Sequence, residues 1–130
     1  MQERRNRSTR NIPMTSPQTL LKAWNLRARK ELGQNFLIEA HVAERIVEQA
    51  GLSSDDVVLE IGAGLGIMTI AAARRAGRVI AVEKDRQLVP LLKVELQVHG
   101  LTHVQVCEGD ILSLPLDRLA DTRDRPMVVI

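Results

Sequence analysis

The stretch VVLEIGAGLG, residues 57–66, decides the fold of this chain. Its apolar run, 57–61, is built from β-forming residues with no polar face, which is typical of a central strand buried on both sides by helices. Three glycines follow at once, and the alanine-rich segment 65–76 then has the pattern of a helix that ends at Gly77. A strand, a glycine turn and a helix start in this order would present free backbone N–H groups to a ligand. A tight turn that binds nothing is the alternative interpretation.

The segment before this stretch predicts two helices. A Ser-Pro pair at 16–17 supplies an N-cap and a first helical residue, so we expect a helix over about 17–25, with Leu20, Leu21 and Trp24 on one face. The spacing of apolar residues predicts a second helix over about 39–50. Its apolar stripe is formed by Val42, Ile46 and Val47, and Gly51 ends it.

Strands and helices alternate after the glycines, which predicts an α/β fold with a doubly wound, mostly parallel sheet. The expected elements are a strand over 78–83, a helix over about 86–98 that closes at Gly100, a strand over 104–108 and a fourth strand from 127 to 130.

Composition sets limits on the class of protein. A chain of 130 residues with 45% hydrophobic and 26% charged residues suits one soluble domain. No apolar run is long enough to span a membrane, and no signal-like segment follows the basic start. The single cysteine, Cys107, excludes an internal disulfide framework and is expected to be a small buried hydrophobe. With no disulfide framework, we expect a reducing, cytoplasmic environment. The three histidines have no metal-ligand spacing, so we expect no metal.

Charge is distributed unevenly along the chain. Residues 1–30 carry eight basic side chains and one acidic one, a net +7, whereas the other 100 residues carry ten basic and fifteen acidic ones, a net −5. A basic arm on an acidic body indicates a polyanionic partner such as nucleic acid, and Arg27, Arg29 and Lys30 are the candidate RNA contacts because they adjoin the folded part. For the first 13 residues, a solvated tail, an organellar transit peptide and a start at Met14 remain alternatives. We therefore divide the chain into a basic arm with a short helix, 1–30, and a cofactor-binding domain, 31–130.

Polar side chains follow three successive strands of the predicted sheet. Glu60 and the glycines come at the end of the first, Glu83 at the end of the second and Asp110 just after the third. Ligands of parallel α/β sheets bind at the carboxyl ends of the strands, so these groups are expected to meet at one site. Glu83 stands 21 residues beyond Gly62, where a carboxylate can accept hydrogen bonds from both hydroxyls of an adenosine ribose.

Two classes of adenosine-containing ligand fit such a site. A dinucleotide fingerprint spaces its glycines G-x-G-x-x-G, but here Ile67 occupies the place of the third glycine. Glu60 is also badly placed beside a pyrophosphate and well placed beside an ammonium and a sulfonium. These charges favour S-adenosylmethionine, whose adenine amine could donate to Asp110, and leave a dinucleotide-dependent oxidoreductase as the alternative.

Four segments resemble the ribosomal RNA adenine N6,N6-dimethyltransferases, the family that includes the bacterial enzyme acting on 16S rRNA. They are KELGQNFL at 30–37, LEIGAGLG at 59–66, AVEKD at 81–85 and EGDIL at 108–112. The resemblance runs from about residue 17 to 130. It implies a Rossmann-like S-adenosylmethionine-dependent methyltransferase fold, and ribosomal RNA of the small subunit as partner.

The resemblance also implies a cofactor site made of residues from all four segments. The implied contacts are Asn35 and Leu37 from the N-terminal connector, Glu60, Gly62 and Gly64 on the methionine side, Glu83 on the ribose hydroxyls, Lys84 and Ile111 against the adenine, and Asp110 on its amine.

The chain departs from the family pattern at its end. Members continue after the fourth strand with an N-L-P-Y motif that forms the target-base pocket, whereas this sequence stops at Ile130 and contains no tyrosine. We therefore expect a fold truncated after the fourth strand, with no catalytic residue and no activity of its own; a non-catalytic RNA-binding relative that uses the basic arm is the alternative. The bare edge of the fourth strand is expected to favour self-association.

Overall fold

Four parallel strands form the sheet of the computed structural model, which describes residues 12–26, 39–115 and 127–130. The strands are β1 (Val57–Ile61), β2 (Arg78–Glu83), β3 (Val104–Glu108) and β4 (Met127–Val129), and their order in the sheet is β3-β2-β1-β4. The registers pair Val57 with Arg78 and with Met127. The predicted α/β architecture with a parallel sheet is confirmed.

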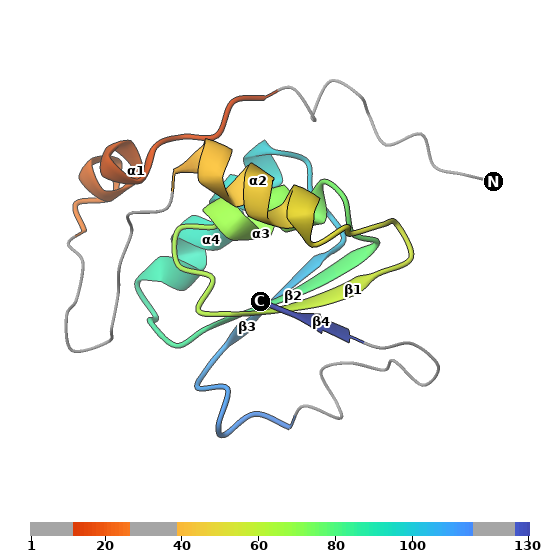
Figure 1. Ribbon diagram of the computed structural model, residues 1–130. Coiled ribbons are helices and arrows are strands. Elements are labelled where there is room, and N and C mark those ends of the chain that lie inside the picture. The colour runs from red at the N-terminus through yellow and green to blue at the C-terminus, as the bar shows by residue number, and fades with distance from the viewer. Residues whose placement is uncertain (1–11, 27–38, 116–126) are drawn as a thin grey trace.

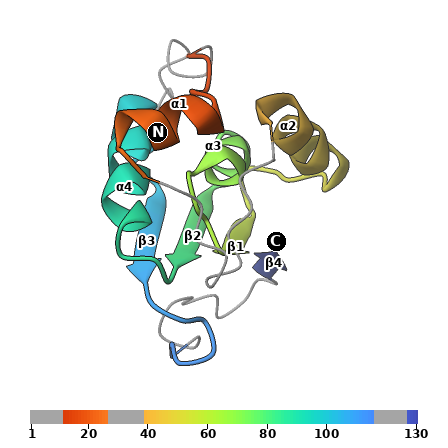
Figure 2. The ribbon, with the colours of Figure 1, turned by 90° about the vertical axis from the view of Figure 1, so that its left-hand side faces the viewer.

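The helices of the described residues lie on one face of this sheet (Figures 1 and 2). They are α1 (Pro17–Ala23), α2 (Ala40–Gln49), α3 (Ile67–Ala73) and α4 (Leu88–Val98). The expectation that helices bury β1 on both sides is therefore wrong for the part of the chain that the structure describes.

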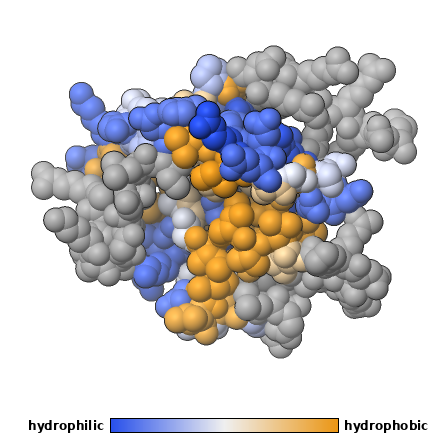
Figure 3. Space-filling model, in the orientation of Figure 1, coloured by the Kyte–Doolittle hydropathy of each residue, from blue (hydrophilic) through white to orange (hydrophobic). Residues whose placement is uncertain are grey.

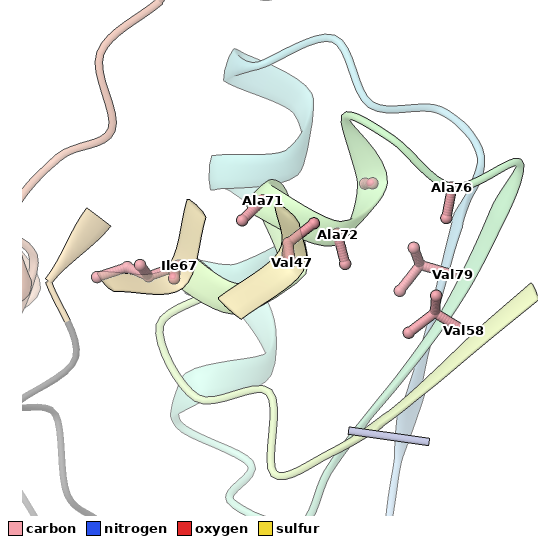
Figure 4. Packing of buried hydrophobic residues seen from close by; sticks show 9 residues of the cluster. Val47, Val58, Ile67, Ala71, Ala72, Ala76 and Val79 are labelled. Carbon is pink, nitrogen blue, oxygen red and sulfur yellow. The ribbon is translucent and has the colours of Figure 1, made fainter. Parts of the chain in front are cut away.

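The core lies between the sheet and the buried helix α3. Val58 of β1 and Val79 of β2 point toward α3, where they meet its alanines, and Val47 of α2 packs over the same helix (Figure 4). Alanine side chains allow a close approach between helix and sheet, so burial here is almost complete. Burying apolar area of this kind stabilises a fold by roughly 25 cal/mol per Å².

The second face of the sheet carries a smaller apolar cluster, to which the segment after β3 contributes Ile111 and Leu114. Leu59, Ile80 and Val82 form a cluster there, against which partly buried side chains pack: Val57, Cys107, Ile111, Leu114 and Met127. Cys107 is thus half-buried, and burial raises the pKa of its thiol. Ile61 and Val129 remain 45% and 58% exposed. Apolar surface accordingly gathers over β1 and β4 below α2 (Figure 3).

Of the apolar stripe predicted for α2, only Val47 is buried. Ala43 and Val47 are the buried residues of this helix, whereas Val42 and Ile46 are each 40% exposed. The small side chain of Ala43 lets α2 sit close to the alanines of α3, and that contact selects the buried row. A sequence stripe cannot show which of two adjacent rows the neighbouring helix will cover.

Two helices end earlier than the sequence predicts. α1 stops at Ala23 because Asn25 adopts a left-handed φ of 53°, and the Leu26 N–H then donates to the Leu21 carbonyl at 2.8 Å. Its predicted N-cap is confirmed, since the Thr19 N–H donates to Ser16 Oγ at 3.2 Å.

α3 ends at Ala73, so Gly77 does not cap it. Gly77 has a different structural reason to be glycine: a Cβ there would lie 2.1 Å from the Ser54 carbonyl oxygen. The predicted closure of α4 is confirmed, because Gly100 adopts a φ of 66° just after the helix.

Candidate cofactor-binding site

The carboxyl ends of β1 and β2 carry two buried carboxylates on the helix-covered face of the sheet. Side chains alternate between faces along a strand, so Glu60 shares the face of Val58, and Glu83 shares the face of Val79. Both valines pack against α3. Glu60 and Glu83 are only 4% and 5% exposed. The two acids predicted for the site therefore lie side by side, at the edge where the glycine loop begins.

The glycine loop is held by hydrogen bonds to the end of β2. The N–H groups of Gly62 and Ala63 both donate to the Val82 carbonyl, at 2.8 and 3.1 Å. The Gly64 N–H donates to Glu83 Oε1 at 2.8 Å, and the Gly66 N–H donates to the Ala63 carbonyl at 3.0 Å. The expectation that this strand, turn and helix start offer free N–H groups is therefore wrong for the three glycines, because the fold itself uses their N–H groups.

Two glycines of the loop are required for different reasons. Gly62 has a φ of 79°, and no atom of the described residues lies within 4 Å of the position that a Cβ would take. Gly66 has a φ of 87°, and a Cβ there would lie 2.7 Å from Cδ1 of Leu92. The positive φ is the reason for glycine at position 62, whereas at position 66 the positive φ and the close packing against α4 both favour glycine. Within the described part of the chain, the space above Gly62 is open.

Glu83 is fixed in one orientation by two backbone donors. The Gly64 N–H binds one of its oxygens, and the Asp85 N–H binds the other at 2.8 Å. Asp85 is itself buried and accepts from the Gln87 N–H at 2.9 Å, which shapes the turn into α4. Each carboxylate oxygen has a second lone pair, so Glu83 retains the capacity to accept hydrogen bonds from a ligand.

Glu60 is the more perturbed of the two acids. Its surroundings together raise its pKa to about 7. Burial is the largest cause, the hydrogen bond that Thr69 Oγ1 donates to Glu60 Oε1 acts in the opposite direction, and the negative charge of Glu83 adds a smaller increase. A buried acid next to a second carboxylate is costly to ionise without a compensating charge. The pair therefore forms a site suited to a cation.

The remaining predicted contacts of this region lie around the same edge. The Gly109 N–H donates to the Glu83 carbonyl at 2.9 Å, which brings Asp110 to the end of β2. Oδ1 of Asp110 accepts from the Leu112 N–H at 3.0 Å. Lys84 is exposed, and Ile111 packs partly buried on the second face of the sheet.

Some predicted residues cannot be placed. Asn35 and Leu37, and the RNA-contact candidates Arg27, Arg29 and Lys30, lie outside the described residues. Within the described ranges, no group of three or more histidine, cysteine or acidic side chains could hold a metal ion. No helix of those ranges is long and apolar enough to cross a membrane.

Thr69 is a site residue that the sequence analysis missed. It is completely buried, yet it is the one polar residue of the helix sequence IMTIAAA, 67–73. A lone hydroxyl in an otherwise apolar helix indicates a buried polar partner, because an unpaired hydroxyl would be costly there. That signal, combined with the acid nine residues earlier, could have identified the pair.

Comparison with known proteins connects this site with one family. The family model for ribosomal RNA adenine dimethylase matches residues 25–128. The ribosomal RNA small subunit methyltransferase A of Desulforapulum autotrophicum is 49% identical over 106 residues, which are 82% of this chain and 37% of that protein. The chain thus spans about a third of the length of the curated relatives that it matches.

Solved structures show the same fold. The 23S rRNA methyltransferase ErmE is 36% identical with a TM-score of 0.55, and the match covers 62% of this chain and 32% of ErmE. An RNA methyltransferase from Salinibacter ruber, in complex with S-adenosyl-L-homocysteine, is 28% identical with a TM-score of 0.57 and covers 62% of this chain and 54% of that one. The fold is therefore the Rossmann-like fold of the S-adenosylmethionine-dependent methyltransferases.

The raised pKa of Glu60 predicts how stability depends on pH. Between about pH 4.5 and 7 the folded chain keeps a proton that the unfolded chain releases, so the free energy of unfolding falls as pH rises through this range. At pH 8 the loss from this group is on the order of 3 kcal/mol. Glu60→Gln keeps an acceptor for Thr69 and removes the titration. Urea unfolding of both proteins at pH 5, 6, 7 and 8 measures the difference.

Glu108→Gln is the matched control, because it removes an exposed acid from the strand next to β2. Its stability should follow the same pH dependence as the original chain. Equal slopes for the original chain and Glu60→Gln would contradict the assignment.

Proposed function

The chain belongs to the ribosomal RNA adenine dimethylase family, and from this premise we propose that it forms the S-adenosylmethionine-binding part of an rRNA adenine-N6,N6-dimethyltransferase. The substrate of the whole enzyme is then ribosomal RNA of the small subunit, and its place of action is the cytoplasm. The family assignment does not support the alternative of a dinucleotide-dependent oxidoreductase. The proposed division of the chain, by charge, remains 1–30 and 31–130, and residues of the first part, among them Leu20, pack on the second.

The observation that carries this proposal is the pair of buried carboxylates beside the glycine loop. S-adenosylmethionine carries an ammonium and a sulfonium, and either cation would offset the cost of ionising Glu60 next to Glu83. The pyrophosphate of a dinucleotide would add two further negative charges at the same place. The charge of the site and the family therefore support the same cofactor.

The proposed contacts follow from where each group lies. Glu83, oriented by two N–H donors, would accept from the ribose hydroxyls. The open space above Gly62 would admit the ligand close to the backbone of the loop. The other proposed contacts rest on the resemblance to the family: Asn35 and Leu37 from the N-terminal connector, Glu60 and Gly64 on the methionine side, and Lys84, Asp110 and Ile111 around the adenine.

When bound, the cofactor would supply an electrophilic methyl group for in-line displacement by the adenine amine. The contribution of the chain is then to position the cofactor, because this displacement forms no covalent bond between the protein and the methyl group. Holding the target base is a separate task, which requires flipping it out of the RNA and stacking it on an aromatic ring. The only aromatic residues of these 130 are Trp24 and Phe36.

We expect Glu83→Gln to weaken binding of S-adenosyl-L-homocysteine about tenfold to a hundredfold, since hydrogen bonds to a charged group contribute about 1.5–3 kcal/mol. Isothermal titration calorimetry measures the dissociation constants. Glu108→Gln is the control, because Glu108 is the exposed register partner of Glu83 on β3 and its replacement changes the net charge equally. Equal affinities for the original chain and Glu83→Gln would exclude this carboxylate from the site.

A polypeptide of these 130 residues should transfer no methyl group to small-subunit rRNA. Stacking on an aromatic side chain contributes about 1–3 kcal/mol per base, and this chain has almost no side chain that could provide it. Incorporation of radioactive methyl groups measures the activity, with a full-length family member as positive control. Methylated adenine in the product would contradict the prediction.

The excess of basic residues in 1–30 favours one second candidate function, a non-catalytic RNA-binding role. RNA binding that is lost when Arg27, Arg29 and Lys30 are replaced by glutamine, together with no detectable affinity for S-adenosyl-L-homocysteine, would favour it. A steep salt dependence would show that phosphates are the groups contacted.

Self-association through β4 is the last part of the proposal. β4 is an edge strand of the sheet that the structure describes, and Val129 on it is exposed. An unprotected apolar edge invites pairing with another chain, so light scattering should show a mass that rises with concentration. Val129→Lys places a charge on the edge and should shift the chain toward the monomer. A monodisperse monomer of the original chain at high concentration would contradict the proposal.

A further inference from the structure

Helix α1 packs directly against the glycine loop. Leu20 of α1 is 4% exposed, and it forms one cluster with the buried Leu65, Leu88 and Leu91. Two further side chains near the end of α1, Leu21 and Leu26, pack partly buried on the same cluster. Figure 2 shows α1 lying beside α4, over the layer that covers the sheet.

This cluster joins the two loops that carry the proposed cofactor contacts. Leu65 lies between Gly64 and Gly66, both of which have positive φ. Leu88 is the first residue of α4 and follows the turn that contains Glu83 and Asp85. Leu20 therefore belongs to the same buried cluster as one residue from each of the two loops.

α1 is itself fixed at both ends, so it can act as a rigid support. Before the helix, Arg74 Nη2 donates to the Ile12 carbonyl at 2.6 Å, and Met14 packs against the core on both sides of α3. After the helix, the N–H groups of Asn25 and Leu26 donate to carbonyls of its last turn, and Leu26 packs on the cluster of Leu20. The segment 12–26 is thus tied to the domain before, within and after α1.

We propose that α1 positions the glycine loop for its ligand and that Leu20 is the positioning residue. The identity of that ligand, S-adenosylmethionine, rests on the proposed function. A loop with glycine on both sides of Leu65 has little conformational preference of its own, so the burial of Leu65 in the cluster that Leu20 completes selects the conformation in which Gly64 binds Glu83. Without Leu20 the ligand must order the loop when it binds, and part of its binding energy is lost.

The test combines a measurement without ligand and one with ligand. Hydrogen exchange by NMR follows the Gly64 N–H, which binds Glu83, and the Gly77 N–H, which binds the Asp56 carbonyl at the opposite end of the sheet. In Leu20→Ala, exchange at Gly64 should accelerate by a larger factor than exchange at Gly77. Affinity for S-adenosyl-L-homocysteine should fall about tenfold, which corresponds to about 1.4 kcal/mol. Leu20→Met should keep most of the slow exchange at Gly64 and most of the affinity for S-adenosyl-L-homocysteine.

Val79→Ala is the matched control, because Val79 is fully buried at the far end of β2 and its truncation destabilises the core without touching the loop. Leu20→Val replaces Leu20→Ala if the latter does not fold. Equal acceleration at both amides in the Leu20 variant, or equal affinities of the Leu20 and Val79 variants, would overturn the proposal. If the original chain binds no S-adenosyl-L-homocysteine, the proposed function fails, and the ratio of exchange rates alone then decides whether α1 holds the loop.

Discussion

The end of β2 holds together three loops that would otherwise be independent. The carbonyl of Val82 accepts the N–H groups of Gly62 and Ala63, and the carboxylate of Glu83 binds the N–H groups of Gly64 and Asp85. The backbone carbonyl of Glu83 then accepts the Gly109 N–H. Two consecutive residues therefore determine where the loops after β1, β2 and β3 lie. A change at Glu83 would alter the shape of the site as well as its charge.

Glu60 is buried beside the carboxylate that holds these loops together. A protein seldom buries a second carboxylate beside the first, because each ionised group loses its hydration and they repel each other. Here Thr69 compensates part of that cost, and Glu60 remains difficult to ionise, with a pKa of about 7. Strongly perturbed acids cluster at functional sites. A cationic ligand is the simplest group that would stabilise the ionised form of both carboxylates at once.

Local signals in the sequence predicted most of the fold. The strands were predicted from short apolar runs, the start of α1 from Ser16 and Pro17, and the end of α4 from Gly100, because caps and turns depend on a few neighbouring residues. That the carboxylates would meet at one edge followed from the parallel sheet. These features need no knowledge of which distant segments meet.

The parts that the sequence did not predict depend on such distant contacts. Which row of α2 is buried depends on the alanines of α3, and Gly77 is glycine because of the Ser54 carbonyl. The N–H groups of the glycine loop looked free, because their acceptors, Val82 and Glu83, lie about twenty residues further along the chain. Hydrogen-bond partners at such a separation become visible only when the strands are in register.

The cluster that Leu20 and Leu65 share is another such distant association, and it links the segment before the basic residues 27–30 with the glycine loop. The basic residues 27–30 follow Leu26, and Leu26 packs on the cluster that holds the glycine loop. Segment 12–26 is anchored through Arg74 before α1 and through this cluster after it. The last described residue before the candidate RNA contacts is therefore held by the same cluster as the glycine loop. Leu26 and Leu65 share this cluster although 38 residues, 27–64, separate them in the sequence.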